Sequence, residues 1–517
     1  MAVIRDIVHH MLREWGMTTI FGNPGSTELG FLQDFPSDLN YVLTLHEAVA
    51  VHAAHGHALA TGRPALVNLH SGPGLGNAMG AILAAKAGRA PLVITAGQQS
   101  RRLVTMEALL TNADATTLPR PAVKWAFESP RPQDVPTALA RARHLAMQPP
   151  QGPVFLSLPA DDWDVEGEDP APLTGRRISA RSVPAPGTLA ALTDRLDRAR
   201  RPVLVLGSGL DSEAGRASAV HLAERTRTPV WTAPSQGRSP FPEDHPQYQG
   251  VLRPAAPLLC QALAEHDLIL VVGAPVFRHY LDLPGPLIPP GSELVLLTDD
   301  PDEAARAPVG DAVLADPALA LAALADLAAP GGHRPLVPRR PAAAPPTDRA
   351  DQILDCLAHL SPDTVIVNES PSTLDTFWNR VTIRRAGGYY TSPDGGLGFG
   401  LAAAVGIQLA DPTRPVVAVI GDGSAQYSIT ALWTAAALRL PLTVLVLRND
   451  RYAVLDWYAQ LTGRKMVPGL TIPGLDHLSL ARGYGATAHQ VVDLAALPAL
   501  LHHPVSEKRP KVLVADL

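Results

Sequence analysis

An acidic residue between two glycines closes an apolar run at residues 415–428, PVVAVIGDGSAQYS. Asp422 stands where a buried strand should end, and Gly421 and Gly423 allow close backbone approach. Asn449 follows the next apolar run, in VLRND. Two oxygen ligands from adjacent strand ends suit a hard divalent cation, and Mg²⁺ commonly combines a few protein oxygens with phosphate oxygens. The pattern favours a metal that holds a phosphate, while an aspartate that caps the following helix stays the alternative.

A second acidic residue, Glu47, lies in an apolar helix start, LTLHEAVAVHAA. Burial of this carboxylate would be costly without a partner, although an acid at a helix N-terminus is also favoured by the helix dipole. Four histidines lie on or beside the same stretch, at positions 46, 52, 55 and 57. Because they form no ligand pattern such as H-E-x-x-H, we interpret them as surface or packing residues.

The elements that position these residues fall into three domains. Two stretches rich in proline, glycine and charge, at 165–187 and 329–347, are interpreted as interdomain linkers. The predicted domains are residues 1–165, 185–328 and 345–517.

In each domain, apolar strand-like runs alternate with helical stretches, which predicts an α/β fold of three open parallel sheets with helices on both faces. Such runs are ALVNL and PLVITAG in the first domain, PVLVLGSG and LILVVGA in the second, and TVIVNES, LTVLVLRND and KVLVADL in the third. Ligands of such sheets bind at the carboxyl ends of strands. The glycine-rich stretches at 207–215 and 395–400 miss the G-x-G-x-x-G spacing, so a nicotinamide cofactor is disfavoured.

Composition excludes several classes of protein. The chain has 517 residues, 46% of them hydrophobic, and a formal charge of −6 with no basic block, which disfavours nucleic acid as a partner. Arg5 and Asp6 interrupt any signal-peptide core, no apolar run suggests a membrane span, and two cysteines argue against a disulfide framework. We therefore expect a cytoplasmic protein without membrane or nucleic-acid partners.

Several longer motifs, in the same order along nearly the whole chain, resemble the thiamine-diphosphate-dependent 2-keto acid decarboxylases, and most of all the members that act on benzoylformate. The matching stretches are FGNPGSTELGFLQDFP, LHEAVAV, NLHSGPGLGNAMGA, ITAGQQ, EALLTN, GPVFLSLPADDWD, VVGAPVFR, GGLGFGLAAAVGIQLA and GDGSAQYSITALWTAA. Agreement of this extent over three domains is highly specific.

The resemblance implies thiamine diphosphate and Mg²⁺ as cofactors. The first domain would grip the aminopyrimidine and the third the diphosphate, across an interface between subunits, so that a homodimer is the minimum and a homotetramer the usual form. The implied metal ligands are Asp422, Asn449 and the carbonyl of Arg451. The implied cofactor-binding residues are Glu47, Pro371, Ser372, Gly395, Leu397, Gly421, Gly423, Ser424, Tyr427, Asn449 and Tyr452.

The resemblance also implies catalytic roles. Glu47 would hydrogen-bond the pyrimidine nitrogen, and Leu397 would hold the cofactor in its bent conformation. Ser26 would bind the substrate carboxylate, although it could instead cap a helix with Glu28 nearby. His70 would assist proton transfer at the keto oxygen, and an imidazole titrates in the useful range, although a histidine at a strand end is more often structural. The implied substrate pocket comprises Leu109, Leu110, Pro371, Val454, Leu455 and Tyr458.

The chain departs from the family near the substrate. The benzoylformate members carry a second catalytic histidine two residues after the arginine of GAPVFR, but here His279 is one position early and Tyr280 occupies that place. Because a one-residue shift turns a side chain to the other side of an extended chain, either Tyr280 takes the role or a bulge brings His279 into the cleft. Pro371 replaces a hydroxyl residue and Val454 a smaller one, which should reshape the acyl pocket.

We therefore predict non-oxidative decarboxylation of an aromatic, benzoylformate-like 2-keto acid to an aldehyde and carbon dioxide, with aldehyde carboligation as a side activity. The alternatives are a carboligase or aldehyde lyase of the same fold and a non-catalytic regulatory homologue, which intact Glu47, Asp422 and Asn449 disfavour.

Overall fold

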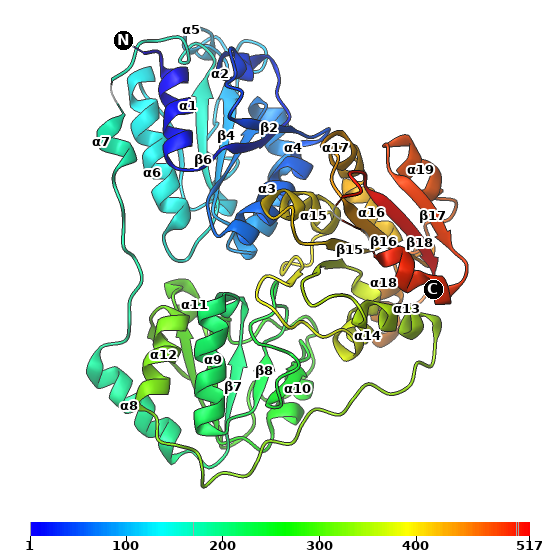
Figure 1. The fold of residues 1–517 in the computed structure, drawn as a ribbon. Coiled ribbons are helices and arrows are strands. Elements are labelled where there is room, and N and C mark those ends of the chain that lie inside the picture. Colours follow the sequence, from blue (N-terminus) through cyan, green and yellow to red (C-terminus); the bar gives the residue numbers. More distant parts are fainter. Residues whose placement is uncertain (1, 169, 503, 505) are drawn as a thin grey trace. The chain divides into compact units, whose positions relative to one another are not determined.

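The computed structural model describes residues 2–168, 170–502, 504 and 506–517. Its strands form three six-stranded sheets, and helices alternate with them along the chain (Figure 1). The chain groups into two compact units. Unit 1 comprises Met1–Ser179, Ile366–Ser372 and Ser392–Leu517, and unit 2 comprises Ala180–Val365 and Thr373–Thr391. The domain boundaries expected from the sequence stay a prediction.

The first sheet has the strand order β2-β1-β3-β4-β6-β5. Neighbouring residues of its strands enter different buried clusters, since Val93 packs with Leu66 on one face and Ile94 with Phe155 on the other. Its strands are β1 (Thr19–Gly22), β2 (Asn40–Leu43), β3 (Ala65–Leu69), β4 (Leu92–Gln98), β5 (Ala126–Glu128) and β6 (Val154–Pro159). The helices beside them in sequence are α1 (Ile4–Glu14), α2 (Leu29–Leu32), α3 (Glu47–Thr61), α4 (Ser71–Ala87), α5 (Arg101–Val104), α6 (Val135–Met147) and α7 (Ala171–Thr174).

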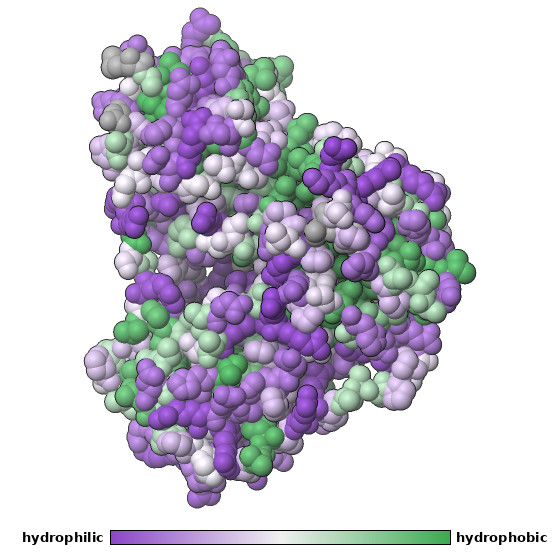
Figure 2. Space-filling model, viewed as in Figure 1, coloured by the Kyte–Doolittle hydropathy of each residue, from purple (hydrophilic) through white to green (hydrophobic). Residues whose placement is uncertain are grey.

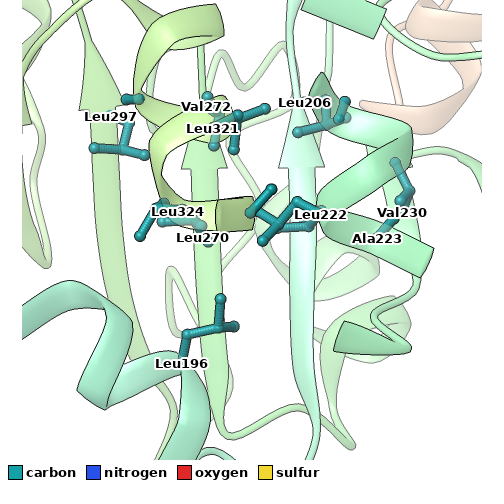
Figure 3. Close-up of a cluster of buried hydrophobic side chains, with 14 of the residues drawn as sticks. Leu196, Leu206, Leu222, Ala223, Val230, Leu270, Val272, Leu297, Leu321 and Leu324 are labelled. Carbon is teal, nitrogen blue, oxygen red and sulfur yellow. The ribbon is translucent and has the colours of Figure 1, made fainter. Parts of the chain in front are cut away.

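The second sheet, in unit 2, has the order β12-β11-β10-β7-β8-β9. Figure 3 shows the core on one of its faces, where Leu270 and Val272 of β10 meet Leu222 of α9 and Leu321 of α12. Its strands are β7 (Pro202–Leu206), β8 (Val230–Thr232), β9 (Tyr248–Val251), β10 (Leu268–Val272), β11 (Glu293–Thr298) and β12 (Asp311–Leu314). Its helices are α8 (Pro186–Arg198), α9 (Glu213–Thr226), α10 (Ala256–Leu263), α11 (Pro301–Arg306) and α12 (Pro317–Leu327).

The third sheet has the order β14-β13-β15-β16-β18-β17. Its strands are β13 (Val365–Glu369), β14 (Tyr389–Tyr390), β15 (Val416–Gly421), β16 (Leu442–Arg448), β17 (Thr487–Val491) and β18 (Lys511–Asp516). The helices beside them in sequence are α13 (Arg349–Ala358), α14 (Leu374–Arg380), α15 (Phe399–Ala410), α16 (Asp422–Ser428), α17 (Ala431–Ala437), α18 (Ala453–Leu461), α19 (His477–Gly483) and α20 (Leu497–Leu501). β15 and β16 run parallel with Gly421 opposite Leu447, so Asp422 and Asn449 leave the sheet at the same edge.

Within unit 1, α3 and α15 pack closely and run in opposite directions. A Cβ on Gly406 would overlap the carbonyl oxygen of Ala53, and a Cβ on Gly56 would overlap that of Ala403, so glycine permits the approach. The rings of His52 and His55 are buried against Phe399, at centroid distances of 5.9 and 4.8 Å. These histidines are therefore packing residues.

The three parallel α/β sheets confirm the predicted fold class. On the face drawn in Figure 2, hydrophobic residues occur in groups among hydrophilic ones. The described part of the chain contains no helix that is both long and apolar enough to cross a membrane.

Candidate active site

Asp422 is the first residue of α16, directly after β15, and only 3% of it is exposed. Its Oδ1 accepts a hydrogen bond from the N–H of Gly423 (2.8 Å). Its Oδ2 accepts from the N–H groups of Asn449 (2.9 Å) and Asp450 (2.6 Å), on the loop after β16. The carboxylate thus joins two adjacent strand ends. Gly421, and not Asp422, occupies the N-cap position of α16, so the simple helix-cap alternative does not describe this residue.

The loop after β16 presents oxygen atoms beside this carboxylate. The Oδ1 of Asn449 accepts from the N–H of Arg451 (3.2 Å), and the Tyr452 ring covers Gly423. A Cβ on Gly423 would lie 2.6 Å from the ring carbon Cε1 of Tyr452, so only glycine lets the tyrosine ring pack this closely on α16. Ser424 is buried in the next position of the helix.

A buried glutamate that the sequence analysis did not single out organises the second glycine-rich loop. Glu369 ends β13, and its two carboxylate oxygens accept hydrogen bonds from the N–H groups of Gly398 and Gly400 at the start of α15. Burial raises the pKa of Glu369 to about 8, and these two hydrogen bonds oppose the rise. Gly398 has φ +106°, a left-handed conformation that favours glycine. The loop that carries Gly395 and the half-buried Leu397 is thereby fixed to the sheet. The signal was present in TVIVNES, an acid after an apolar run, as in the GDG stretch.

Glu47 begins α3 and is 8% exposed. Its Oε2 accepts a hydrogen bond from the side-chain amide of Asn77 on α4 (3.1 Å), a partner that the sequence analysis missed. Phe399, the first residue of α15, contacts His55, eight residues further along α3. Phe399 also contacts His52, five residues from Glu47, so at about 1.5 Å per residue Glu47 lies about 7–8 Å along α3 from the nearer contact.

Ser26 and His70 come together through Glu28. Ser26 is exposed at the start of a short 3-10 helix, Ser26–Glu28, whose N-cap position is occupied by Gly25. His70 follows β3, and its Nδ1 lies 2.9 Å from Oε2 of the buried Glu28. His70 and the residues on either side of Ser26, Gly25 and Thr27, therefore bind the same buried carboxylate.

The remaining residues expected near cofactor and substrate are accessible in unit 1. Pro371 and Ser372 are exposed after β13, and Tyr427 is exposed on α16. On α18, Val454 and Tyr458 are half-buried and Leu455 is exposed, while Leu109 is exposed and Leu110 has φ +71° in a separate loop. The substrate pocket stays a prediction.

His279 and Tyr280 lie in unit 2, after β10, and both are exposed. The ring of His279 lies edge-on to Phe277, and the Tyr280 N–H donates to the Pro254 carbonyl (2.8 Å). Burial lowers the pKa of His279. Whether Tyr280 or His279 approaches the residues of unit 1 stays a prediction.

The donor set around Asp422 fits a magnesium-bound diphosphate. Among the described residues, no group of three or more His, Cys, Asp and Glu side chains is placed to hold a metal ion. A metal at Asp422 would therefore need amide and carbonyl oxygens from the chain and further oxygens from its ligand, which is how Mg²⁺ is bound with phosphates. Three N–H groups fix the carboxylate of Asp422, and the loop that supplies two of them carries the neutral oxygen Oδ1 of Asn449.

Comparison with known proteins identifies the class that this fold and site define. Residues 3–118 match the thiamine pyrophosphate enzyme N-terminal TPP binding domain, residues 189–324 its central domain, and residues 374–515 its C-terminal TPP binding domain. The chain belongs to the thiamine pyrophosphate enzyme family, which confirms the predicted family and its cofactor, thiamine diphosphate.

Among its relatives, benzoylformate decarboxylase of Pseudomonas aeruginosa is 48% identical over 524 residues, which cover 99% of this chain and 98% of the relative. A thiamine diphosphate-dependent 4-hydroxybenzoylformate decarboxylase of Rhodococcus jostii RHA1 has a similar structure, with a TM-score of 0.96, 42% identity, and coverage of 99% of this chain and 98% of the other. Benzoylformate decarboxylase of Polynucleobacter necessarius also has a TM-score of 0.96, with 40% identity over 100% of this chain and 99% of the other.

Proposed function

We propose that this chain decarboxylates benzoylformate-like aromatic 2-keto acids to an aldehyde and carbon dioxide, using thiamine diphosphate. The observation that carries the proposal is the 48% identity to a benzoylformate decarboxylase across 99% of the chain. The two proteins of similar structure are named as decarboxylases of 4-hydroxybenzoylformate and of benzoylformate, which supports an aromatic acyl group in the substrate. When bound, thiamine diphosphate supplies a carbanion that adds to the keto carbon and then accepts the electron pair released with carbon dioxide.

The residues of the third sheet hold the cofactor. Asp422, Asn449 and the carbonyl of Arg451 coordinate Mg²⁺, and the N-terminal end of α16 faces the diphosphate. The supporting observation is a buried carboxylate that joins two adjacent strand ends. Leu397, on the loop fixed by Glu369, supports the cofactor from one side.

Glu47 moves a proton at the pyrimidine nitrogen, because it is a nearly buried carboxylate with a single described side-chain partner, Asn77. Ser26 holds the substrate carboxylate, and His70 holds or moves a proton at the keto oxygen. Their shared support is the buried carboxylate of Glu28. The proposed pocket for the aryl group comprises Leu109, Leu110, Pro371, Val454, Leu455 and Tyr458, and Tyr280 or His279 serves in proton transfer.

The working form is a homo-oligomer, a tetramer built from dimers. One observation supports a second copy beside Glu47, whose side chain accepts a hydrogen bond from Asn77 of α4. The adjacent face of α4 exposes Gly76, Gly80 and Leu83, with open space beside both glycines. A cytoplasmic location and aldehyde carboligation stay predictions.

The experiment is a panel of 2-keto acids, with carbon dioxide and aldehyde both measured. Benzoylformate and its 4-hydroxy analogue are expected to give kcat/KM at least 10-fold above pyruvate, since an aromatic pocket discriminates by a few kcal/mol at most. A preference for pyruvate would contradict the proposed acyl group.

A further inference from the structure

Glu28 is a buried acid with an unusual number of partners. It is 1% exposed, and its Oε2 accepts from the N–H of Gly25 (2.8 Å) and faces Nδ1 of His70 (2.9 Å). Its Oε1 accepts from the hydroxyl of Thr27 (2.7 Å) and the N–H of Gly97 (2.9 Å). Three donors therefore bind this carboxylate, and Nδ1 of His70 is its fourth partner.

This arrangement settles which nitrogen of His70 carries hydrogen. A carboxylate whose other partners are all donors can only accept, so Nδ1 of His70 must donate to it. The hydroxyl oxygen of Thr27 lies 3.2 Å from the same nitrogen and serves as a second acceptor, because its own hydrogen points to Glu28. Nε2 of His70 hydrogen-bonds to no described residue and is left for chemistry.

The same carboxylate also fixes the loop that carries Ser26. Gly25 and Thr27 flank this serine, and both are bound to Glu28. A Cβ on Gly25 would overlap the imidazole of His70, so the loop and the ring are in direct contact. The Glu28 carboxylate therefore binds two separate segments of unit 1, the loop that carries Ser26 and the residue His70 after β3.

We propose that Glu28 is a positioning residue for the decarboxylation: it holds His70 with Nδ1 protonated, so that Nε2 is the nitrogen that exchanges a proton with the substrate. The inference rests on the proposed function of His70. It assigns no contact between Glu28 and the substrate, because Glu28 acts through His70.

The decisive variant is Glu28→Gln. A glutamine has the same shape but is neutral, and its amide can turn either its oxygen or its NH₂ group toward Nδ1, so His70 is no longer held in one tautomer. We expect kcat to fall on the order of 100-fold, the lower end of what a positioned acid–base group contributes. In a His70→Ala background, Glu28→Gln is expected to change kcat by less than about threefold. Equal losses in both backgrounds would show that Glu28 does not act through His70.

A second readout does not depend on turnover. Diethyl pyrocarbonate modifies an accessible, unprotonated ring nitrogen, and peptide mass spectrometry resolves His70 from the exposed His10, which serves as internal reference. In cofactor-free protein, Glu28→Gln is expected to slow labelling of His70 at least fivefold relative to His10. Unchanged labelling would overturn the assignment of the tautomer. If labelling changes but His70→Ala retains full kcat, the proposed function of His70 fails and the positioning by Glu28 stands.

Controls separate positioning from folding. Glu303, a buried acid of unit 2 that accepts from the Thr298 hydroxyl (3.0 Å), provides the matched variant Glu303→Gln, which is expected to leave kcat and His70 labelling unchanged. If Glu28→Gln does not fold, Thr27→Val replaces it in the cycle. That variant removes one donor to Glu28 and is expected to lower kcat severalfold only while His70 is present, and the same loss without His70 would refute the proposal.

Discussion

The variant Asp422→Asn is expected to lose the cofactor-linked part of the protein's stability while it keeps its fold. The aspartate accepts three backbone hydrogen bonds, one on Oδ1 and two on Oδ2. An asparagine oriented with its oxygen at the Oδ2 position keeps two of these bonds and faces the Gly423 N–H with an NH₂ group. The loss of one buried bond costs about 1–3 kcal/mol, and the loss of charge on the other two adds about 1 kcal/mol. We therefore expect the cofactor-free variant to be about 2–4 kcal/mol less stable.

The increase in the free energy of unfolding on cofactor binding distinguishes an aspartate that binds the metal from one that is purely structural. At a cofactor concentration 100-fold above Kd, binding stabilises the native state by about 2.7 kcal/mol. If loss of the Asp422 carboxylate raises Kd 100-fold, the gain at the same concentration falls to about 0.4 kcal/mol. Urea denaturation with and without thiamine diphosphate and Mg²⁺ measures both quantities.

The matched control is Asp211→Asn, because the Asp211 side chain is also buried and also accepts from a backbone N–H, that of Gly387 (3.1 Å), but belongs to unit 2. It is expected to lower the stability of the cofactor-free protein and to keep the full gain of about 2.7 kcal/mol. If Asp422→Asn also keeps the full gain, its carboxylate only joins the two strand ends, and the proposed metal site is wrong.

Three further outcomes are expected. Glu47→Gln should keep fold and cofactor affinity but lower kcat at least 100-fold, because an amide cannot take a proton from the pyrimidine nitrogen; near-normal turnover would refute the role. Tyr280→Phe should lower kcat more than His279→Ala, which should stay within a fewfold, and the reverse order would favour a bulge that brings the histidine in. Burial raises the pKa of Glu243 from 4.5 to about 7, so the native state retains a proton that the unfolded chain has lost, and stability falls as pH rises between these values. In Glu243→Gln the amide can donate to the Ser239 hydroxyl. Urea denaturation should therefore show this variant to be more stable than the parent protein by up to about 3 kcal/mol above pH 7, with almost no difference in stability at pH 4.5. An equal gain in stability at both pH values would contradict this.

The sequence was sufficient to predict that Asp422 and Asn449 lie close together, because parallel strands place their carboxyl ends at one edge of the sheet. The prediction needed only the order of apolar runs and the acid that follows one of them, and the register of β15 and β16 confirms the shared edge. The alternation of side chains within β10 and β4 follows from the same periodicity.

The roles of Glu28 and Glu369 were not predicted, because their hydrogen-bond partners depend on the arrangement of strands and loops in three dimensions. Glu28 reaches His70 across 42 residues of sequence, and Glu369 reaches Gly398 across 29. Spacing along the chain gives no sign of such pairs. The direction of the Tyr280 side chain depends on the backbone conformation of an irregular segment, and residue types alone do not determine that conformation.

The most direct measurement is a titration of cofactor-free protein with thiamine diphosphate in the presence of Mg²⁺, with benzoylformate as substrate. We predict no turnover without cofactor, saturation at one thiamine diphosphate per chain, and release of carbon dioxide and benzaldehyde in a one-to-one ratio. Cofactor bound at that stoichiometry, with no carbon dioxide released from any aromatic 2-keto acid, would contradict the proposed decarboxylation.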